Sequence, residues 1–407
     1  MNLGIYLNNN YKLIQNKLIL LYAFFIPLSL DIMRILAISI ILVGLLQIKN
    51  NKRYLQDIID IALKIKIVFL LSILLLSLLW TDFTNIQIGF KYITRYWYIL
   101  PLFFIFININ RDYIPKIISS FLLGMMISEL LSYSVFFELI HIPHISHTDP
   151  SVFMHHTLYS VFLAFTVGIL IDRILTTDTT LKQKLIYIFF SLTITANLFI
   201  NAGRTGQVIF IFILISVLIS KSLLNLKTIL STISIAGFIF YISYSYSPNF
   251  QYRFKQTIEN INHISYDTPI GSRIGLNIVA KDIILENPIL GVGVGDYLSK
   301  KVETIDKKYT AKMQYVKSLE HYHNQYAEFM VIGGILGLIA YLSMWWSIAK
   351  ISIKNKHIKT IKFILIVSFL LASLTDAFFH LNRPLSLFAL FVGLILAQNR
   401  YEEQKTI

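Results

Sequence analysis

The stretch HNQYAEFMVIGGILG, residues 323–337, marks the point where a long polar segment runs into an apolar helix. His323 and Asn324 stand at its polar end, and Gly334 and Gly337 follow 11 and 14 residues after the histidine. At ~3.6 residues per turn these glycines fall on or near the helical face of His323, so that another helix can approach that face closely. We therefore expect a functional site at the end of a membrane helix, because histidine is well suited to exchange a proton near neutral pH.

The composition is that of a membrane protein. Of the 407 residues, 56% are hydrophobic and only 14% are charged. A soluble protein carries roughly 25% charged residues, so the chain is expected to cross a bilayer several times. Cysteine is absent from the sequence, which excludes disulfides, thiolate metal sites and cysteine nucleophiles.

Apolar runs predict an all-α integral membrane fold with about 12 transmembrane helices. The expected spans are residues 17–30, 31–48, 63–80, 93–108, 114–139, 152–171, 185–201, 204–220, 228–244, 326–349, 361–379 and 384–398. Both termini then lie on one side, which is expected to be cytoplasmic because the short connections on the other side carry few basic residues. Those few are Arg34, Lys91, Arg95, Arg204 and Arg383. The net charge of +14 is spread over the membrane faces, which argues against a nucleic-acid partner.

The spans divide the chain into three parts. Residues 1–244 hold the first nine helices, residues 245–322 form a polar loop on the outer side, and residues 323–407 hold the last three helices with a cytoplasmic C-terminus. A loop of this length is expected to have helices of its own. We predict one helix at 273–286, ended by Asn287-Pro288, a turn at 291–295, and a second helix at about 306–320. The loop would then form a helical cap on the outer face.

Two arginines accompany His323 on the outer side. Arg204 lies in the sequence NAGRTG at a helix junction, where a glycine on either side would leave room for a ligand, and Arg273 begins the first loop helix. Guanidinium groups bind phosphate oxygens in a bidentate manner, so this pair beside a histidine predicts an anionic substrate. Snorkelling of each arginine to lipid headgroups is the alternative.

Further charged residues leave two interpretations open. Lys91 and Arg95, four residues apart beside an aromatic cluster, either anchor the chain at the headgroups or bind a ligand, and Arg34 is similarly ambiguous. Asp376 lies near the outer end of a predicted span, close in sequence to His380 and Arg383. An ionisable residue inside a membrane segment is a candidate functional residue.

Other motifs carry less weight or are absent. His141, His144 and His147 could bind a transition metal, but Pro143 interrupts a helix there, so a solvated loop is the favoured interpretation. The sequence has no Asp-x-Asp, no P-loop and no Gly-x-Ser-x-Gly motif, and the glycines at 291–295 follow a predicted helix rather than a strand. A metal-dependent sugar-nucleotide site and a nucleotide cofactor are therefore not expected.

These residues resemble the O-antigen ligase family of the bacterial O-antigen ligase and polymerase superfamily. The ligase signature is a histidine, then Asn, Ser or Gln, nine residues, a glycine, two residues, and Gly, Thr or Tyr, which His323, Asn324, Gly334 and Gly337 match. Arg204 matches the family's arginine before the large outer loop. The superfamily's loop pattern is matched by Ser272, Arg273, Ala280, Pro288, Gly291, Gly293 and Tyr297.

The resemblance implies transfer of a glycan from undecaprenyl diphosphate to a hydroxyl of lipid A-core, at the periplasmic face of the bacterial inner membrane. It implies a fold like that of the GT-C-type membrane glycosyltransferases and an inverting reaction without metal or cofactor. His323 would take the acceptor proton, Arg204 and Arg273 would hold the diphosphate, and Asn324 would orient His323 or the loop. Further substrate contacts would come from Lys91, Arg95, Arg34 and Asp376, and Gly334 and Gly337 would be structural.

Three alternatives stay open. An O-antigen polymerase uses the same donor, but its usual arginine followed ten residues later by glycine is not found at Arg204, Arg253 or Arg273. A protein O-oligosaccharyltransferase shares the loop motif and differs in acceptor. Asn277 and Ile332 stand where relatives commonly carry tryptophan and an acidic residue, which leaves the acceptor open. A transporter or flippase would carry charges along a path through the membrane, whereas these charges crowd its outer edge.

Overall fold

The computed structural model describes residues 3–50, 52–176, 179–223, 225–246, 248–309 and 313–404. All regular elements in these ranges are helices, which confirms the predicted all-α class. Five of the described helices are long and apolar enough to cross a membrane, and the bent pair α3–α4 makes up to six. The chain is therefore a multi-pass membrane protein, and the count of twelve spans stays a prediction.

The first half of the chain forms the helices α1 Leu3–Phe25, α2 Leu30–Asn50, α3 Arg53–Lys64, α4 Ile67–Leu76, α5 Ile86–Thr94, α6 Pro101–Asn108, α7 Ile114–Phe136, α8 His156–Ile174 and α9 Leu181–Ile200. The second half forms α10 Arg204–Ser220, α11 Leu226–Tyr246, α12 Pro248–Asn262, α13 Pro269–Glu286, α14 Tyr297–Lys308, α15 Gln314–Ser318, α16 Gln325–Lys350, α17 Lys356–Ala372 and α18 Asn382–Glu403. Short 3-10 helices include η3 Arg95–Ile99 and η6 Phe378–His380.

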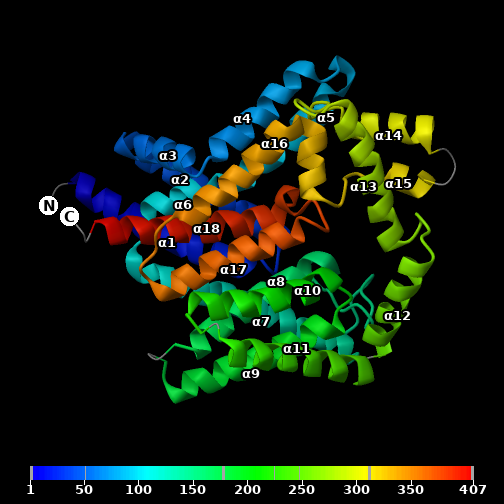
Figure 1. The fold of residues 1–407 in the computed structure, drawn as a ribbon. Helices are drawn as coiled ribbons and strands as arrows, with labels where there is room; N and C mark the ends of the chain where they lie inside the picture. The colour runs from blue at the N-terminus through cyan, green and yellow to red at the C-terminus, as the bar shows by residue number, and fades with distance from the viewer. Residues whose placement is uncertain are drawn as a thin grey trace.

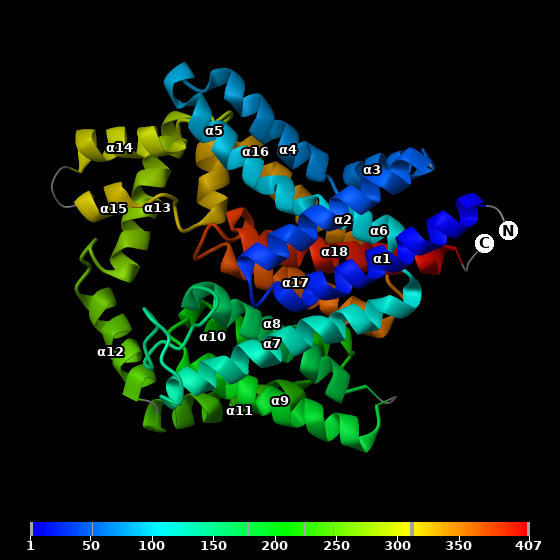
Figure 2. The ribbon, with the colours of Figure 1, turned by 180° about the vertical axis from the view of Figure 1, so that it is seen from behind.

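The long helices form one bundle around α18, whose residues 384–399 are all buried. This helix packs against α6 and α17, and α10 packs against α8 and α17. Both termini lie at one end of the bundle, whereas α13, α14 and α15 lie at the opposite end (Figures 1 and 2). The end that carries these three helices is where the site is found.

The prediction of a single continuous span at 63–80 is wrong, because the helix is bent within it. Helix α3 ends at Lys64, and α4 continues at an angle of 79° to it after Lys66, which has a left-handed φ of +56°. Charged and apolar residues alternate with a helical period in α3, so the helix exposes Leu55, Ile59 and Leu63 while it buries Ile61 and Ala62. The apolar run at 63–80 therefore begins at the end of α3 and continues, after the bend, through α4.

The polar segment folds as four helices, α12 to α15. The predicted helix at 273–286 is confirmed as α13, which starts earlier, at Pro269, after its N-cap Thr268. It ends at Glu286, with Asn287 as the C-cap before Pro288. The predicted helix at 306–320 is wrong, because α14 begins at Tyr297, α15 is a separate short helix, and residues 310–312 lie outside the described part. The inward face of α14 is formed by Tyr297, Lys301, Thr304 and Ile305, at helical spacing.

Helix α16 is broken at Gly334, which has φ +59° and ψ −153°. The loop after α13 lies in the break: N–H groups of Val292 and Gly293 donate to the carbonyls of Val331 and Ile332, at 2.8 and 3.0 Å, and Ile335 N–H donates to Pro288 at 2.9 Å. These bonds replace those that the helix loses, as broken membrane helices require.

The expected close approach of another helix to Gly334 and Gly337 is therefore wrong. A Cβ at Gly334 would lie 2.2 Å from the carbonyl oxygen of Ile289, in the loop, and one at Gly337 would lie 2.5 Å from that of Phe329, in the same helix. The break brings both carbonyls close, so these glycines serve a loop and not a helix–helix contact.

Candidate functional site

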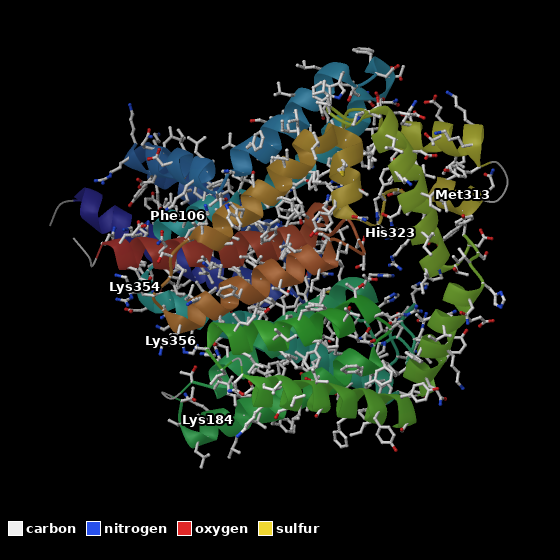
Figure 3. The ribbon with its side chains drawn as sticks, viewed as in Figure 1. Phe106, Lys184, Met313, His323, Lys354 and Lys356 are labelled. Carbon is white, nitrogen blue, oxygen red and sulfur yellow. The ribbon has the colours of Figure 1, made fainter. Side chains whose placement is uncertain are left out.

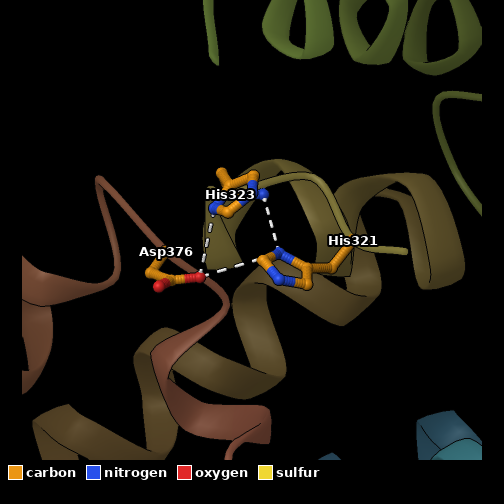
Figure 4. A group of neighbouring side chains, drawn as sticks. All are labelled: His321, His323 and Asp376. Atoms are coloured by element: carbon orange, nitrogen blue, oxygen red, sulfur yellow. Dashed lines mark hydrogen bonds and ion pairs between the residues drawn. The ribbon is translucent and has the colours of Figure 1, made fainter. Parts of the chain in front are cut away.

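A histidine pair and a carboxylate meet at the end of the bundle that carries α13 (Figures 3 and 4). His323 Nδ1 lies 3.4 Å from Asp376 Oδ1, and His321 Nδ1 lies 3.6 Å from the same oxygen. The imidazole rings are 4.0 Å apart. Asp376 was expected inside a span, but α17 ends at Ala372 and the aspartate lies in the turn that follows.

The backbone of His323 is held in an uncommon conformation. Its φ is +48°, in the left-handed region that residues other than glycine rarely adopt. The N–H of His323 donates to His321 Nδ1 at 3.3 Å, and the next residue, Asn324, is the N-cap of α16. The histidine is thus positioned by its neighbours in sequence as well as by Asp376.

The two histidines differ in what they can do. Because Nδ1 of His321 accepts the N–H of His323, its ring proton belongs on Nε2. Burial and, to a lesser extent, the nearby His323 lower the pKa of His321 to about 4, so His321 is neutral at neutral pH. Burial raises the pKa of Asp376, but His323 and His321 more than offset this, and the carboxyl group stays ionised. Asp376 therefore lies as a charged neighbour 3.4 Å from His323 Nδ1, which makes no hydrogen bond to the described residues, and the Nε2 side of the ring is left available.

The turn at 373–377 joins four helices at this site. Arg273 donates from Nε to the carbonyl of Thr375 at 3.1 Å, and the Thr205 and Thr375 hydroxyls lie 3.0 Å apart. Gln325 N–H donates to Ser373 at 2.8 Å. Helices α13, α10 and α16 are thereby tied to the turn that carries Asp376, so Arg273 and the start of α10 lie close to His323.

Asn324 is the N-cap of α16. Its Oδ1 accepts the N–H groups of Tyr326 and Ala327 at 3.1 and 3.2 Å, and its Nδ2 donates to Asn277 Oδ1 at 2.8 Å. Asn277 in turn donates to the carbonyl of Arg273. Of the two expected roles for Asn324, these bonds favour orientation of the loop, because the side chain contacts α13 and not the His323 imidazole.

Arg204 begins α10 and donates from Nη2 to Gln256 Oε1 at 3.3 Å. The expectation that its flanking glycines leave room for a ligand is wrong. A Cβ at Gly206 would lie 2.1 Å from the backbone of Ser160, and one at Gly203 would lie 2.3 Å from the carbonyl oxygen of His156. The glycines let α10 pack closely on α8, and the open space lies on the other side of Arg204.

That space is a pocket of 340 Å³, which we call the aromatic pocket. It lies between the end of α9 and helices α10, α11 and α12, with Arg204 and Arg253 in its wall. The other lining residues are Phe199, Asn201, Ala202, Gln207, Val208, Phe210, Ile211, Phe240, Phe250, Phe254 and Thr257.

A second pocket, of 810 Å³, gathers most of the remaining outer basic residues. We call it the cationic pocket; its charged lining residues are Arg34, Lys91, Arg95 and Arg383. Arg34 is already engaged, by Tyr98 at 2.7 Å and Asp31 at 3.1 Å. Within the described part of the chain, the charged groups of Lys91 and Arg95 have no hydrogen-bond partner, and Arg95 lies within electrostatic range of Glu328.

His155 connects the cationic pocket to the histidine site. It lines the pocket and lies within electrostatic range of both Asp376 and Arg273. Its Nδ1 accepts the N–H of Thr157 at the start of α8, which fixes the ring. His155 thus links the cationic pocket to the centre that contains Asp376 and Arg273.

Glu328 is a site residue that the sequence reasoning missed. It is fully buried; its carboxylate accepts the Tyr92 hydroxyl at 2.8 Å and the Tyr322 N–H at 3.1 Å, and His380 Nδ1 lies 4.0 Å away. The bond to Tyr322 fixes the backbone between His321 and His323. The available signal was a single acidic residue in an apolar helix, five residues after His323.

The histidine run in the loop before α8 does not gather into a cluster. Among the described residues, His147 pairs with Glu138 at 3.5 Å, and the group with metal-ligand spacing is His321, His323 and Asp376, whose ligand atoms lie within 4.8 Å of one another. Ligation by His321 Nδ1 would break its bond to the His323 N–H, so this atom fits a metal poorly.

Comparison with known proteins points to one family. No curated protein matches the chain. The matched segment of a family model, described as O-antigen ligase, runs from α9 into α16 and includes Arg204, Arg273, Asn324 and Gly334, whereas Asp376 and the cationic pocket lie outside it. The match indicates an activity of the O-antigen ligase and polymerase type. Residues 189–342 are therefore similar to the O-antigen ligase family, to which the sequence motifs also point.

Proposed function

We propose that this protein is an O-antigen ligase, which transfers a glycan from undecaprenyl diphosphate to a hydroxyl of lipid A-core at the periplasmic face of the inner membrane. The observation that carries the proposal is the His323–Asp376 pair, 3.4 Å apart, with Arg273 tied to the same turn and basic pockets on either side. The twelve-span topology, the resemblance to GT-C-type enzymes and the cytoplasmic C-terminus belong to this proposal.

The reaction needs a base, an orientation for the two substrates and positive charge for the leaving group. His323 Nε2 takes the proton of the acceptor hydroxyl, and the nearby Asp376 carboxylate stabilises the positive charge that the ring gains. The acceptor oxygen attacks the anomeric carbon from the face opposite the diphosphate, so a carbon–oxygen bond forms as the bond to the diphosphate breaks, with inversion. The electron pair leaves on the diphosphate, whose charge is stabilised by Arg204 and Arg273.

This chemistry draws on side-chain cations rather than on a metal ion. Arg204 and Arg273 have no carboxylate partner in the described part of the chain, so their charge is available to a diphosphate. In the cationic pocket, Lys91, Arg95 and Arg34 would bind anionic groups of the acceptor. Its volume of 810 Å³ suits part of an oligosaccharide.

The deletion phenotype tests the reaction type. Loss of a ligase leaves bare lipid A-core while lipid-linked polymer accumulates, and the wild-type gene but not His323→Ala should restore the polymer on a lipopolysaccharide gel. A general base typically contributes ~10²–10⁴-fold, so that variant should be nearly inactive at normal membrane levels. Core with a single repeat unit would instead indicate a polymerase, and loss of protein glycans with intact lipopolysaccharide would indicate an oligosaccharyltransferase. Full ligation by His323→Ala would refute the assignment of the base.

A further inference from the structure

The aromatic pocket has walls that suit a hydrocarbon chain. Phe199 packs edge-on against Phe250, with ring centroids 5.7 Å apart, and Phe240 packs edge-on against Phe250 and Phe254, both at 5.4 Å. Phe240 and Phe254 are each more than a third exposed, so the aromatic surface faces the open space and not only the protein core. Such a surface favours an apolar ligand.

The guanidinium groups of the same pocket favour binding of an anion. Arg204 and Arg253 lie within electrostatic range of each other and of Arg273, and in the described part of the chain none of the three pairs with a carboxylate. Arranging guanidinium groups together without a counter-ion is unfavourable unless an anion binds between them. The N-terminus of α10, where Arg204 lies, adds the positive end of a helix dipole.

A buried donor without a partner supports this conclusion. Asn201, 3% exposed, lines the pocket; its Oδ1 accepts the Ser151 hydroxyl, but its Nδ2 has no partner among the described residues. Arg253 Nε is likewise buried without a partner. Buried donors in native structures are nearly always satisfied, so these two atoms point to a missing acceptor.

The size of the pocket selects the kind of lipid. A volume of 340 Å³ is at the lower end of the ~300–1,000 Å³ typical of ligand sites. It accommodates the first part of a single chain, whereas the several acyl chains of lipid A would need far more room. Of the two lipid substrates of the proposed reaction, the donor is the one that fits.

The position of the pocket agrees with this assignment. The Thr205–Thr375 contact and the bond from Arg273 to Thr375 place the start of α10, where Arg204 lines the pocket, beside the turn that carries Asp376. A diphosphate held by Arg204 and Arg273 would direct its sugar towards His323 and its hydrocarbon chain into the pocket. The cationic pocket, reached past His155, is then left for the acceptor.

We propose that the aromatic pocket binds the first isoprene units of the donor's polyprenyl chain, with Arg204, Arg253 and Asn201 contacting its diphosphate. This inference rests on the proposed function, because it assumes a donor carried on a prenyl diphosphate. It assigns the two lipid substrates to opposite sides of His323.

Binding of inorganic diphosphate and farnesyl diphosphate to the full-length protein in nanodiscs, measured by calorimetry against empty nanodiscs, separates the head from the chain. In the wild type, farnesyl diphosphate should bind at least about tenfold more tightly, because its chain is buried. Ile211→Trp fills the pocket from α10. It should bring the ratio of the two affinities close to one without weakening the binding of inorganic diphosphate. Ile219→Trp, at an exposed position two turns further along α10 and outside the pocket, should keep the wild-type ratio.

Each outcome decides the inference. A wild-type ratio near one, an unchanged ratio in Ile211→Trp, or equal competition by phosphatidylglycerol would overturn it; the last would make the pocket a site for bulk phospholipid. Glycan transfer by the wild type, assayed separately, distinguishes the two proposals. Transfer with an unaltered ratio in Ile211→Trp refutes only the pocket, whereas chain-dependent binding without any transfer refutes the ligase function.

Discussion

Replacement of Gly334 by alanine should destabilise the protein at the break in α16. The backbone there has φ +59° and ψ −153°, a combination that is essentially restricted to glycine and costs other residues ~1–3 kcal/mol. The new Cβ would also lie 2.2 Å from the carbonyl oxygen of Ile289, so the loop would have to move. Movement would break the bonds of Val292, Gly293 and Ile335 described above, each worth ~1 kcal/mol. The sum is about 4–6 kcal/mol.

Gly333→Ala is the matched control. Its Cβ would meet a single side-chain atom, Cγ2 of Ile73, at 3.0 Å, and Gly333 has no positive φ. Thermal unfolding of the purified proteins should therefore show a melting temperature several degrees lower for Gly334→Ala than for Gly333→Ala. Transfer activity of Gly334→Ala should also fall below that of the control at a temperature where both are folded, because the loop leads directly to the helix of Arg273. Equal melting temperatures would refute the reasoning.

Four further outcomes follow from the site. Asp376→Asn should lower transfer by about 10²–10⁴-fold at normal expression, because His323 loses the carboxylate that stabilises the positive charge of its ring, and wild-type rates in a purified assay would contradict this. Glu328→Ala should lower both the melting temperature and kcat, whereas Glu328→Gln, which can still accept the Tyr322 N–H, should recover most of both; equal behaviour of the two variants would contradict the positioning role. Since the folded pKa of His321 is about 4 and the unfolded value is ~6.5, the unfolded state binds the extra proton first as the pH falls. Stability should therefore decline by up to ~3 kcal/mol between pH 6.5 and 4, and His321→Asn should flatten that decline in melting temperature against pH. Activity should survive extensive washing with EDTA, and a loss that Mg²⁺ or Mn²⁺ restores would disprove the metal-independent reaction.

Local sequence signals predicted the local structure of the loop in part. Helix α13 could be predicted because a proline follows its last turn and apolar residues recur at helical spacing. The start of α14 was misplaced because its inward face includes Lys301 and Thr304, which carry no apolar signal although both are buried. Tertiary burial of a lysine stem is not visible in a pattern of hydrophobic residues.

The site required contacts that sequence spacing does not encode. His323, Arg273 and Arg204 were identified by their residue types at helix ends, but the partnership of His323 with Asp376 spans 53 residues and depends on how α17 ends. The cationic pocket draws on α2, α5, η3 and α18, so its basic residues could be named but not assembled. Gly334 was expected to support close packing, because glycine permits both a close contact and a positive φ and the sequence does not distinguish them.

The break in α16 gives the spacing of the motif a structural meaning, because it fixes the length of helix between Asn324 and Gly334. Nine residues separate Asn324, which starts the helix, from Gly334, which interrupts it. At ~1.5 Å and ~100° per residue, one inserted residue would move His323 away from the anchored loop and rotate it by more than a quarter of a turn. The histidine would then face a different side of the bundle from Arg273, although every side chain of the site was still present. The fixed spacing therefore sets the rotational position of His323 about the axis of α16 relative to Arg273.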